Sequence, residues 1–129
     1  MARSKLLSTA YKLIDGFNAW DEDLIFGCRT EDCRHQFWPP RTPDAQGSDN
    51  AEARQHFLDT KDIFKNFHVD VLETAEDPEK HRVVMFAHAE MDTAAGGKIL
   101  DYILLIDVDD TNDKIKRILQ STQTKDKPA

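Results

Sequence analysis

The chain has 129 residues, of which 40% are apolar, and a net charge of −7 from 17 basic and 24 acidic side chains. This size and apolar content predict one folded domain rather than two domains or a disordered chain, and no apolar run reaches the roughly 18 residues of a membrane span or forms a signal peptide. Because the Lys and Arg residues are dispersed among acidic ones, nucleic acid is a poor partner, and we expect a small molecule or another protein instead.

Two helices are predicted at the start of the chain. Apolar residues recur at three- and four-residue intervals from Leu6 to Phe17, and Leu7, Tyr11 and Trp20 widen the same stripe. This spacing is typical of an amphipathic helix of about four turns. Asp21 is placed to cap a second, short helix over residues 22–26, which ends near Gly27.

An extended segment and a third helix follow. Residues 34–38 are predicted to form a short strand that ends at Pro39-Pro40, and residues 41–49 form a polar loop long enough to act as a rim or lid. Asp49 then begins a helix in which Glu52 completes a capping box. The apolar face of this helix carries Ala53, Phe57, Thr60, Ile63 and Phe64.

The rest of the chain alternates with a period of two, which predicts four strands joined by tight turns. The strands cover residues 67–72, 82–93, 98–108 and 114–124, and residues 125–129 form a flexible tail after a single domain of residues 1–124. Helices gathered first and a meander after them predict an α+β fold. In it, three N-terminal helices pack on a curved antiparallel sheet around an internal pocket.

The order of these elements resembles the NTF2-like superfamily over essentially the whole chain. Four local patterns resemble the fungal SnoaL-like isomerases and cyclases of polyketide and meroterpenoid biosynthesis: residues 10–17, Cys33-Arg34-His35-Gln36-Phe37, residues 50–57 and Val83-Val84-Met85-Phe86. The resemblance implies a cone-shaped fold and a homodimer formed through the sheet. It also implies a cofactor-free enzyme in which pocket histidines and carboxylates move protons on an enolisable substrate.

Two positions depart from that group. Ala51 stands where its members tend to carry an acidic residue, and the nearest carboxylate is Glu52. The last strand has Gln120-Ser121-Thr122-Gln123, without the carboxylate that ends this strand in many SnoaL-like chains. The identity of a catalytic acid is therefore left open.

Histidines are the first candidates for proton transfer, because an imidazole titrates near neutrality. His56 shares a helix face with Phe57 and Thr60, so the helical period directs it inward. On the short strand, either His35 or Trp38 lines the mouth of the pocket, depending on which face turns inward. Each histidine is equally compatible with a packed side chain that only hydrogen-bonds a neighbour.

On the long strand 82–93, His88 shares one face with Glu90 and Asp92. A carboxylate beside an imidazole raises its basicity and suits general acid–base catalysis. The other face, which begins with Val83 and Met85, is more apolar and is therefore the natural core face. If that face turns inward, His88 and Glu90 look outward.

The expected function is a cofactor-independent isomerase or cyclase that acts by proton transfer on a polyketide or terpenoid intermediate of fungal secondary metabolism. Its candidate acids and bases are His56, His35, Glu52, His88, Glu90 and Asp101. Tyr102 is placed to hydrogen-bond a carbonyl or enolate of the substrate. The predicted substrate contacts are Phe17, Phe37, Trp38, Phe57, Phe64, Phe86 and Tyr102.

Other functions remain open. A dehydratase would use the same pocket, and a non-catalytic NTF2-like binding or dimerisation module explains every histidine without catalysis. A binding module needs a filled interior and an exposed apolar sheet patch, whereas an enzyme needs a cavity.

Two cysteines, Cys28 and Cys33, are too few for a disulfide framework or a zinc site. We interpret them as ordinary thiols and expect a cytoplasmic protein without a metal site. The absence of a cofactor is what the resemblance implies.

Overall fold

The chain folds into three α-helices and a five-stranded sheet over residues 3–40 and 46–128, which the computed structural model describes. The predicted α+β class is confirmed. Residues 41–45 of the predicted polar loop lie outside the described residues. The elements are α1 (Lys5–Ala19), α2 (Glu22–Gly27), β1 (Arg29–Phe37), α3 (Asn50–Thr60), β2 (Lys65–Asp77), a 3-10 turn (Pro78–Lys80), β3 (Arg82–Thr93), β4 (Gly96–Val108) and β5 (Ile115–Asp126).

Side chains fix the start of each helix. The Ser4 hydroxyl accepts a hydrogen bond at the start of α1, and the Asp21 carboxylate does so at the start of α2. At α3, the Asp49 carboxylate accepts from the backbone N–H of Glu52 at 2.8 Å, and the Glu52 carboxylate accepts from the backbone N–H of Asp49 at 3.2 Å. The predicted capping box is therefore present. Among the described residues, no helix combines the length and apolar character needed to cross a membrane.

The sheet has the strand order β1-β5-β4-β3-β2. Strands β2 to β5 pair antiparallel, but β1 pairs parallel to β5, so the prediction of a wholly antiparallel sheet is wrong at this edge. The backbone N–H of Ile115 donates to the carbonyl of Cys28 at 2.8 Å, which starts β1 beside β5. At the other end, β5 includes Lys125 and Asp126, which the sequence pattern assigns to the tail.

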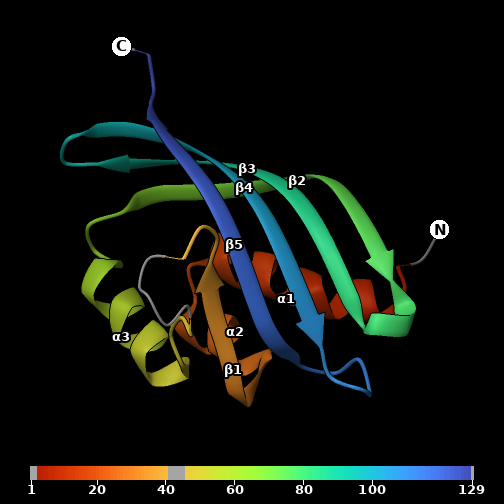
Figure 1. Ribbon diagram of the computed structural model, residues 1–129. Coiled ribbons are helices and arrows are strands. Elements are labelled where there is room, and N and C mark those ends of the chain that lie inside the picture. Colours follow the sequence, from red (N-terminus) through yellow and green to blue (C-terminus); the bar gives the residue numbers. More distant parts are fainter. Residues whose placement is uncertain (1–2, 41–45, 129) are drawn as a thin grey trace.

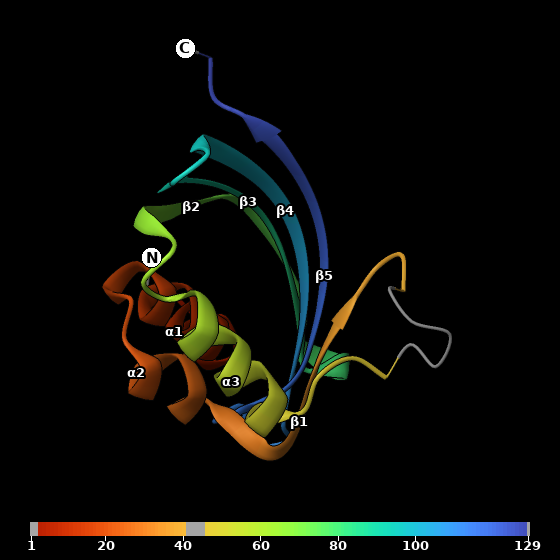
Figure 2. The ribbon, with the colours of Figure 1, turned by 90° about the vertical axis from the view of Figure 1, so that its left-hand side faces the viewer.

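The sheet curves strongly, and the helices lie against its concave side (Figures 1 and 2). The side-chain amide of Asn18 at the end of α1 donates to the carbonyl of Val69 in β2 at 3.0 Å and accepts from its N–H at 2.8 Å. The indole N–H of Trp20 donates to the carbonyl of Lys61 at 3.0 Å, which holds the ends of α1 and α3 together. These contacts hold α1 and α3 along one end of the sheet.

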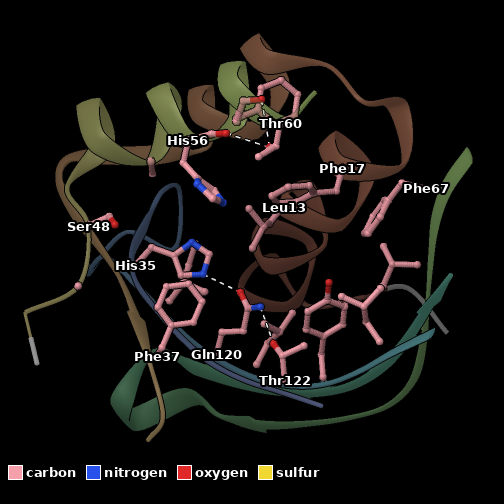
Figure 3. A pocket seen from close by; sticks show the side chains of 18 of the residues that line it. Leu13, Phe17, His35, Phe37, Ser48, His56, Thr60, Phe67, Gln120 and Thr122 are labelled. Atoms are coloured by element: carbon pink, nitrogen blue, oxygen red, sulfur yellow. Dashed lines mark hydrogen bonds between the residues drawn. The ribbon is translucent and has the colours of Figure 1, made fainter. Parts of the chain in front are cut away.

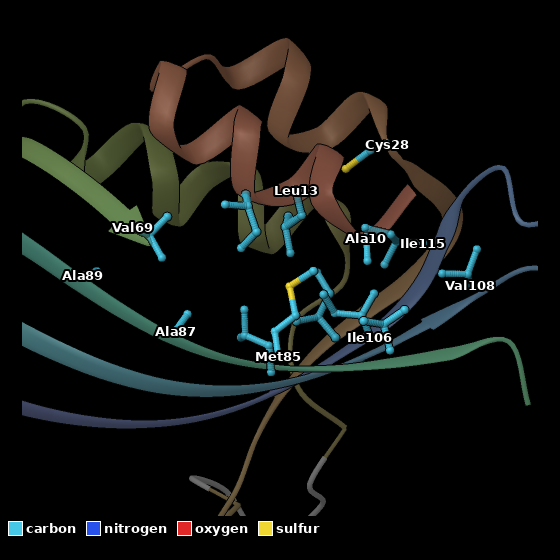
Figure 4. Close-up of a cluster of buried hydrophobic side chains, with 14 of the residues drawn as sticks. Ala10, Leu13, Cys28, Val69, Met85, Ala87, Ala89, Ile106, Val108 and Ile115 are labelled. Carbon is cyan, nitrogen blue, oxygen red and sulfur yellow. The ribbon is translucent and has the colours of Figure 1, made fainter. Parts of the chain in front are cut away.

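The hydrophobic core fills only part of the space under the sheet. Figure 4 shows Ala10 and Leu13 of α1 facing Met85, Ile106 and Ile115 of the sheet, all of them buried. The inward positions of β3 begin with Val83 and Met85, as its more apolar face predicts. Along β4, Leu100, Leu104, Ile106 and Val108 belong to this core. Leu100 and Leu104, together with Tyr102, also line a cavity nearer the other end of the strand.

Candidate active site

A cavity of about 730 Å³ lies between α1, α3 and the concave side of the sheet. This volume is within the range of roughly 300–1,000 Å³ that is typical of small-molecule sites. Most of its lining is apolar, from Leu13 and Phe17 of α1 to Val69, Met91 and Leu100 of the sheet. The polar lining consists of Arg29, His35, Ser48, Glu52, His56, Thr60, Tyr102, Gln120, Thr122 and Thr124.

Aromatic side chains form one wall of the cavity. The ring centroids of Phe17 and Phe67 lie 6.1 Å apart, and Trp20 lies 5.1 Å from Phe57 and 5.3 Å from Phe67. Tilted contacts of this kind hold rings in place beyond what burial alone gives. Five predicted substrate contacts line the cavity: Phe17, Phe37, Phe57, Phe64 and Tyr102.

The opposite wall carries a chain of hydrogen bonds. His35 Nε2 lies 2.7 Å from Gln120 Oε1, and Gln120 Nε2 donates to Thr122 Oγ1 at 2.6 Å (Figure 3). Since Oε1 of an amide only accepts, His35 Nε2 carries the proton of this contact. The imidazole also stacks on Phe37, with ring centroids 5.2 Å apart and 16° between the ring planes.

At the rim of the cavity, Ser48 lies beside His35 of β1. His35 and Ser48 exchange two backbone hydrogen bonds, of 2.9 and 2.8 Å. Gly47 makes this approach possible, because its φ is +72° and a Cβ at this position would lie 2.2 Å from the carbonyl oxygen of His35. Arg34 donates to the carbonyls of Gln46 and Gly47, at 3.1 and 3.2 Å. Residues 46–48 therefore hold the backbone of His35 in place.

The α3 helix contributes His56, Glu52 and Thr60 to the lining. Figure 3 shows the His56 imidazole entering the same space as that of His35, with Phe17 and Phe67 beyond it. Among the described residues, no hydrogen bond or ion pair engages the His56 imidazole. His56 is an exposed residue of the cavity lining. Glu52 differs, since its carboxylate already accepts the hydrogen bond of the helix cap.

Tyr102 extends from the central part of β4 into the cavity, directly across from Thr122 of β5. Burial raises the pKa of Tyr102 to about 12. Its phenol is therefore neutral at physiological pH and can donate a hydrogen bond. Within the described residues, no hydrogen bond engages its hydroxyl.

Three predicted acid–base residues lie outside the cavity. His88 Nδ1 is 2.9 Å from Asp101 Oδ1 and His88 Nε2 is 3.6 Å from Glu90 Oε2, on the outer face of the sheet. Of the two orientations that the sequence leaves open for this strand, the structure has the outward one. Burial of the more apolar face explains it. The prediction that these side chains reach the pocket is therefore wrong.

Two predicted substrate contacts also lie elsewhere. Phe86 shares the outer face of β3 and is 43% exposed, and Trp38 is 63% exposed beyond the end of β1. His35, rather than Trp38, lines the mouth. Sequence reasoning missed Gln120 and Thr122 as cavity residues, although their alternation on the last strand places both on one face. It also missed Arg29, because the predicted strand begins only at residue 34.

No protein-family model matches the chain. It is 27% identical over 113 residues to core atranone cluster protein 11 from Stachybotrys chlorohalonatus, covering 88% of this chain and 84% of the relative. It is 24% identical over 121 residues to austinoid biosynthesis cluster protein H from Aspergillus calidoustus, covering 92% of this chain and 82% of the relative. Both relatives are fungal proteins named for a cluster, which in the second name is a biosynthesis cluster.

Solved structures share the fold. The BvnE pinacolase from Penicillium brevicompactum has a TM-score of 0.84 at 19% identity, covering 92% of this chain and 86% of the pinacolase chain. A protein described as a SnoaL-like polyketide cyclase, from Shewanella denitrificans, has a TM-score of 0.75 at 9% identity, covering 94% and 92%. The resemblance that the sequence indicates, to SnoaL-like proteins and to proteins of fungal biosynthesis clusters, is confirmed. At these identities the structural likeness concerns the fold.

Proposed function

We propose that this protein is a cofactor-independent isomerase or cyclase that moves protons on an enolisable polyketide or terpenoid intermediate of fungal secondary metabolism. The observation that carries the proposal is the 730 Å³ cavity, with two imidazoles and one phenol on an otherwise mostly apolar lining. The curated relatives, one of which is named for a biosynthesis cluster, support the metabolic setting.

In the proposed reaction, His56 removes a proton from the carbon beside a substrate carbonyl. Its imidazole reaches the cavity and has no partner within the described residues, so it can take the proton without first breaking a contact. Tyr102 donates a hydrogen bond to the oxygen on which the enolate charge develops. A donor placed there in an apolar site lowers the barrier more than the same donor in water. The proton then returns to another atom of the substrate, which leaves its composition unchanged.

His35 has a positioned role in this scheme. Its Nε2–H is held by Gln120, and its ring is held flat against Phe37. An imidazole fixed in this way serves as the second proton-transfer group, since its orientation is set before the substrate binds. Glu52 is the one carboxylate among the described lining residues, and as a helix cap it is a weaker candidate for the acid.

The unfilled interior favours an enzyme over a pure binding module. The same pocket is compatible with a dehydratase, which would release water and lower the product mass by about 18 Da.

The outer face of the sheet favours the formation of a dimer. Phe86 and Ile103 are neighbours in the β3–β4 register and are 43% and 46% exposed. We propose that two copies of the chain pair through this face.

The test uses solvent deuterium. The gene is deleted from a strain that carries it. The intermediates that accumulate in this strain are then incubated with the purified protein in D₂O. Liquid chromatography with mass spectrometry then follows their conversion. We expect a product that carries deuterium at the carbon to which the proton returns. His56→Gln and His35→Gln, tested separately, should lower the rate by about 10²- to 10⁴-fold, the usual contribution of general acid–base catalysis.

The matched control is His68→Gln, because His68 is an exposed histidine that pairs with Asp70 on β2 and does not line the cavity. It should retain the wild-type rate. Full turnover in both the His56 and His35 variants would rule out the proposed mechanism. An unlabelled product lighter by about 18 Da would instead identify a dehydratase.

A further inference from the structure

Arg29 is an unusual component of the cavity wall. It is 7% exposed, and it and Asp107 are the two charged side chains that lie buried among the described residues. Asp107 pairs with two arginines. Arg29, in contrast, forms no ion pair with any Asp or Glu of the described chain.

The protein contacts of Arg29 leave most of its hydrogen-bonding capacity unused. Its Nε–H donates to the carbonyl of Ile25 at 3.2 Å, and its Cζ lies 4.5 Å from the centre of the Phe26 ring. These contacts satisfy one of the five N–H groups and cover one face of the guanidinium. No acceptor among the described residues engages the Nη atoms. Burial lowers the pKa of Arg29, although an arginine remains charged at neutral pH.

A buried charge without a counter-ion is rarely tolerated in a folded protein, because the loss of hydration is not compensated. Here the charge borders a cavity, and both Arg29 and Phe26 belong to its lining. The compensating group can therefore be part of a ligand. The planar fork of a guanidinium matches the two oxygens of a carboxylate.

We infer that Arg29 forms an anion subsite on the cavity wall, which binds a carboxylate of the substrate and holds the rest of its apolar skeleton against the aromatic wall. This inference rests on the proposed function and deepens it, since it assigns a charge to the substrate. The rest of the cavity lining carries little negative charge that would repel an anion bound at Arg29. Glu52, its one carboxylate within the described residues, is exposed and engaged in the helix cap.

The test compares two probes of nearly equal shape, 2-naphthoate and its neutral amide, 2-naphthamide. Isothermal titration calorimetry at pH 7 measures the binding of each probe to the purified protein. We expect the wild type to bind the carboxylate at least about 10-fold more tightly than the amide, as a charge-assisted bidentate contact predicts. Arg29→Met should bring the two affinities within about 2-fold of each other and leave amide binding unchanged.

The control variant is Arg54→Met. Arg54 also lies over the Phe26 ring, at 4.8 Å, but pairs with Glu22 at 2.6 Å and does not line the cavity. This variant should keep the wild-type preference. If it loses the preference as Arg29→Met does, the effect comes from general loosening around Phe26, and the inference is wrong.

A second measurement needs no variant and so does not depend on how Arg29→Met folds. The Nε–H resonance of Arg29 in ¹⁵N-labelled wild-type protein should shift on addition of naphthoate and stay in place with naphthamide. Equal affinities of the wild type for the two probes, or an unmoved resonance, overturns the anion subsite. Neither result affects proton transfer by His56, which the deuterium experiment tests separately.

Discussion

His35 Nε2 and Gln120 Oε1 lie 2.7 Å apart, across the parallel junction between β1 and β5. Gln120 pairs with Phe37 in the register of this junction, which places it diagonally beside His35 on the same inward face. The contact fixes the tilt of the imidazole. It also leads to Thr122, so three polar side chains of the cavity wall form one connected unit.

Replacing Gln120 therefore tests whether the orientation of His35 matters. Gln120→Leu keeps the approximate volume but removes the acceptor. We expect a stability loss of about 0.5–1.5 kcal/mol for the lost hydrogen bond and a fall in turnover of about 10- to 100-fold through misplacement of the imidazole. Urea unfolding and the deuterium assay measure the two effects. Substitution of Gln123, which is exposed on the same strand, serves as the control and should change neither.

Tyr102 offers a test in which stability and activity separate. Tyr102→Phe removes only the hydroxyl, which has no hydrogen-bond partner among the described residues. We expect the free energy of unfolding to stay the same or rise slightly, since no protein contact is lost. Turnover should fall by about 10²- to 10³-fold if the hydroxyl stabilises the enolate oxygen. A variant that is as active as the wild type would remove Tyr102 from the mechanism.

Local patterns were sufficient to predict much of this fold. The alternation from Arg82 to Thr93 gives the observed bounds of β3. It also gives the orientation of this strand, because burial of its one strongly apolar face decides which side turns inward. The caps at Asp21 and Asp49 are likewise encoded by a few adjacent residues. Periodicity on α3 was sufficient to direct His56 toward the cavity.

The polar wall of the cavity depends on contacts that a single sequence does not encode locally. Residues 29–33 carry three charged side chains and no strand-like alternation, and they become extended because β5 pairs beside them. The neighbours of His35 are set by this long-range register. On the outer face, His88 and Asp101 attract attention as an acid–base pair, although the burial of the opposite face directs them away from the pocket.

The Asp107 network predicts a pH dependence of stability. Burial by itself would raise the pKa of Asp107, but hydrogen bonds from Arg82 and Arg117 outweigh it and hold the pKa below its ordinary value. Its stabilising contribution is therefore fully present above the unfolded-state pKa, near about 3.9, and is lost as the pH falls through the lower folded-state pKa. Asp107→Asn should cost about 1–3 kcal/mol at pH 7 and less near the lowest pH at which the wild type stays folded.

Urea unfolding of both proteins at the two pH values measures this difference. The control is Asp110→Asn, because Asp110 is exposed in the β4–β5 turn and should show no such trend. A cost for Asp107→Asn that is equal at both pH values would contradict the assignment.

His88 gives the opposite dependence. Its hydrogen bond to Asp101 raises the pKa of the imidazole, with Glu90 contributing, so the folded state favours the charged form. The stabilising contribution is present below the unfolded-state pKa, near about 6.5, and is lost as the pH rises through the higher folded-state pKa. His88→Gln should destabilise by less than about 1 kcal/mol at pH 5.5, as a surface pair does, and have no effect at pH 9. Turnover should stay within about 2-fold of wild type, and a large loss would return His88 to the mechanism.

The exposed pair Phe86 and Ile103 on the outer face of the sheet predicts the oligomeric state. In a symmetric dimer formed through this face, a charged residue that replaces Phe86 or Ile103 lies close to the same residue of the second copy and loses its hydration. Phe86→Glu should therefore convert a dimer into a monomer with an unchanged circular dichroism spectrum, as light scattering coupled to size-exclusion chromatography measures. Leu24→Glu is the matched control, because Leu24 is 51% exposed but lies on α2, away from the outer face. A wild-type monomer, or a Phe86→Glu variant that remains dimeric, would show that the outer face of the sheet does not hold two copies together.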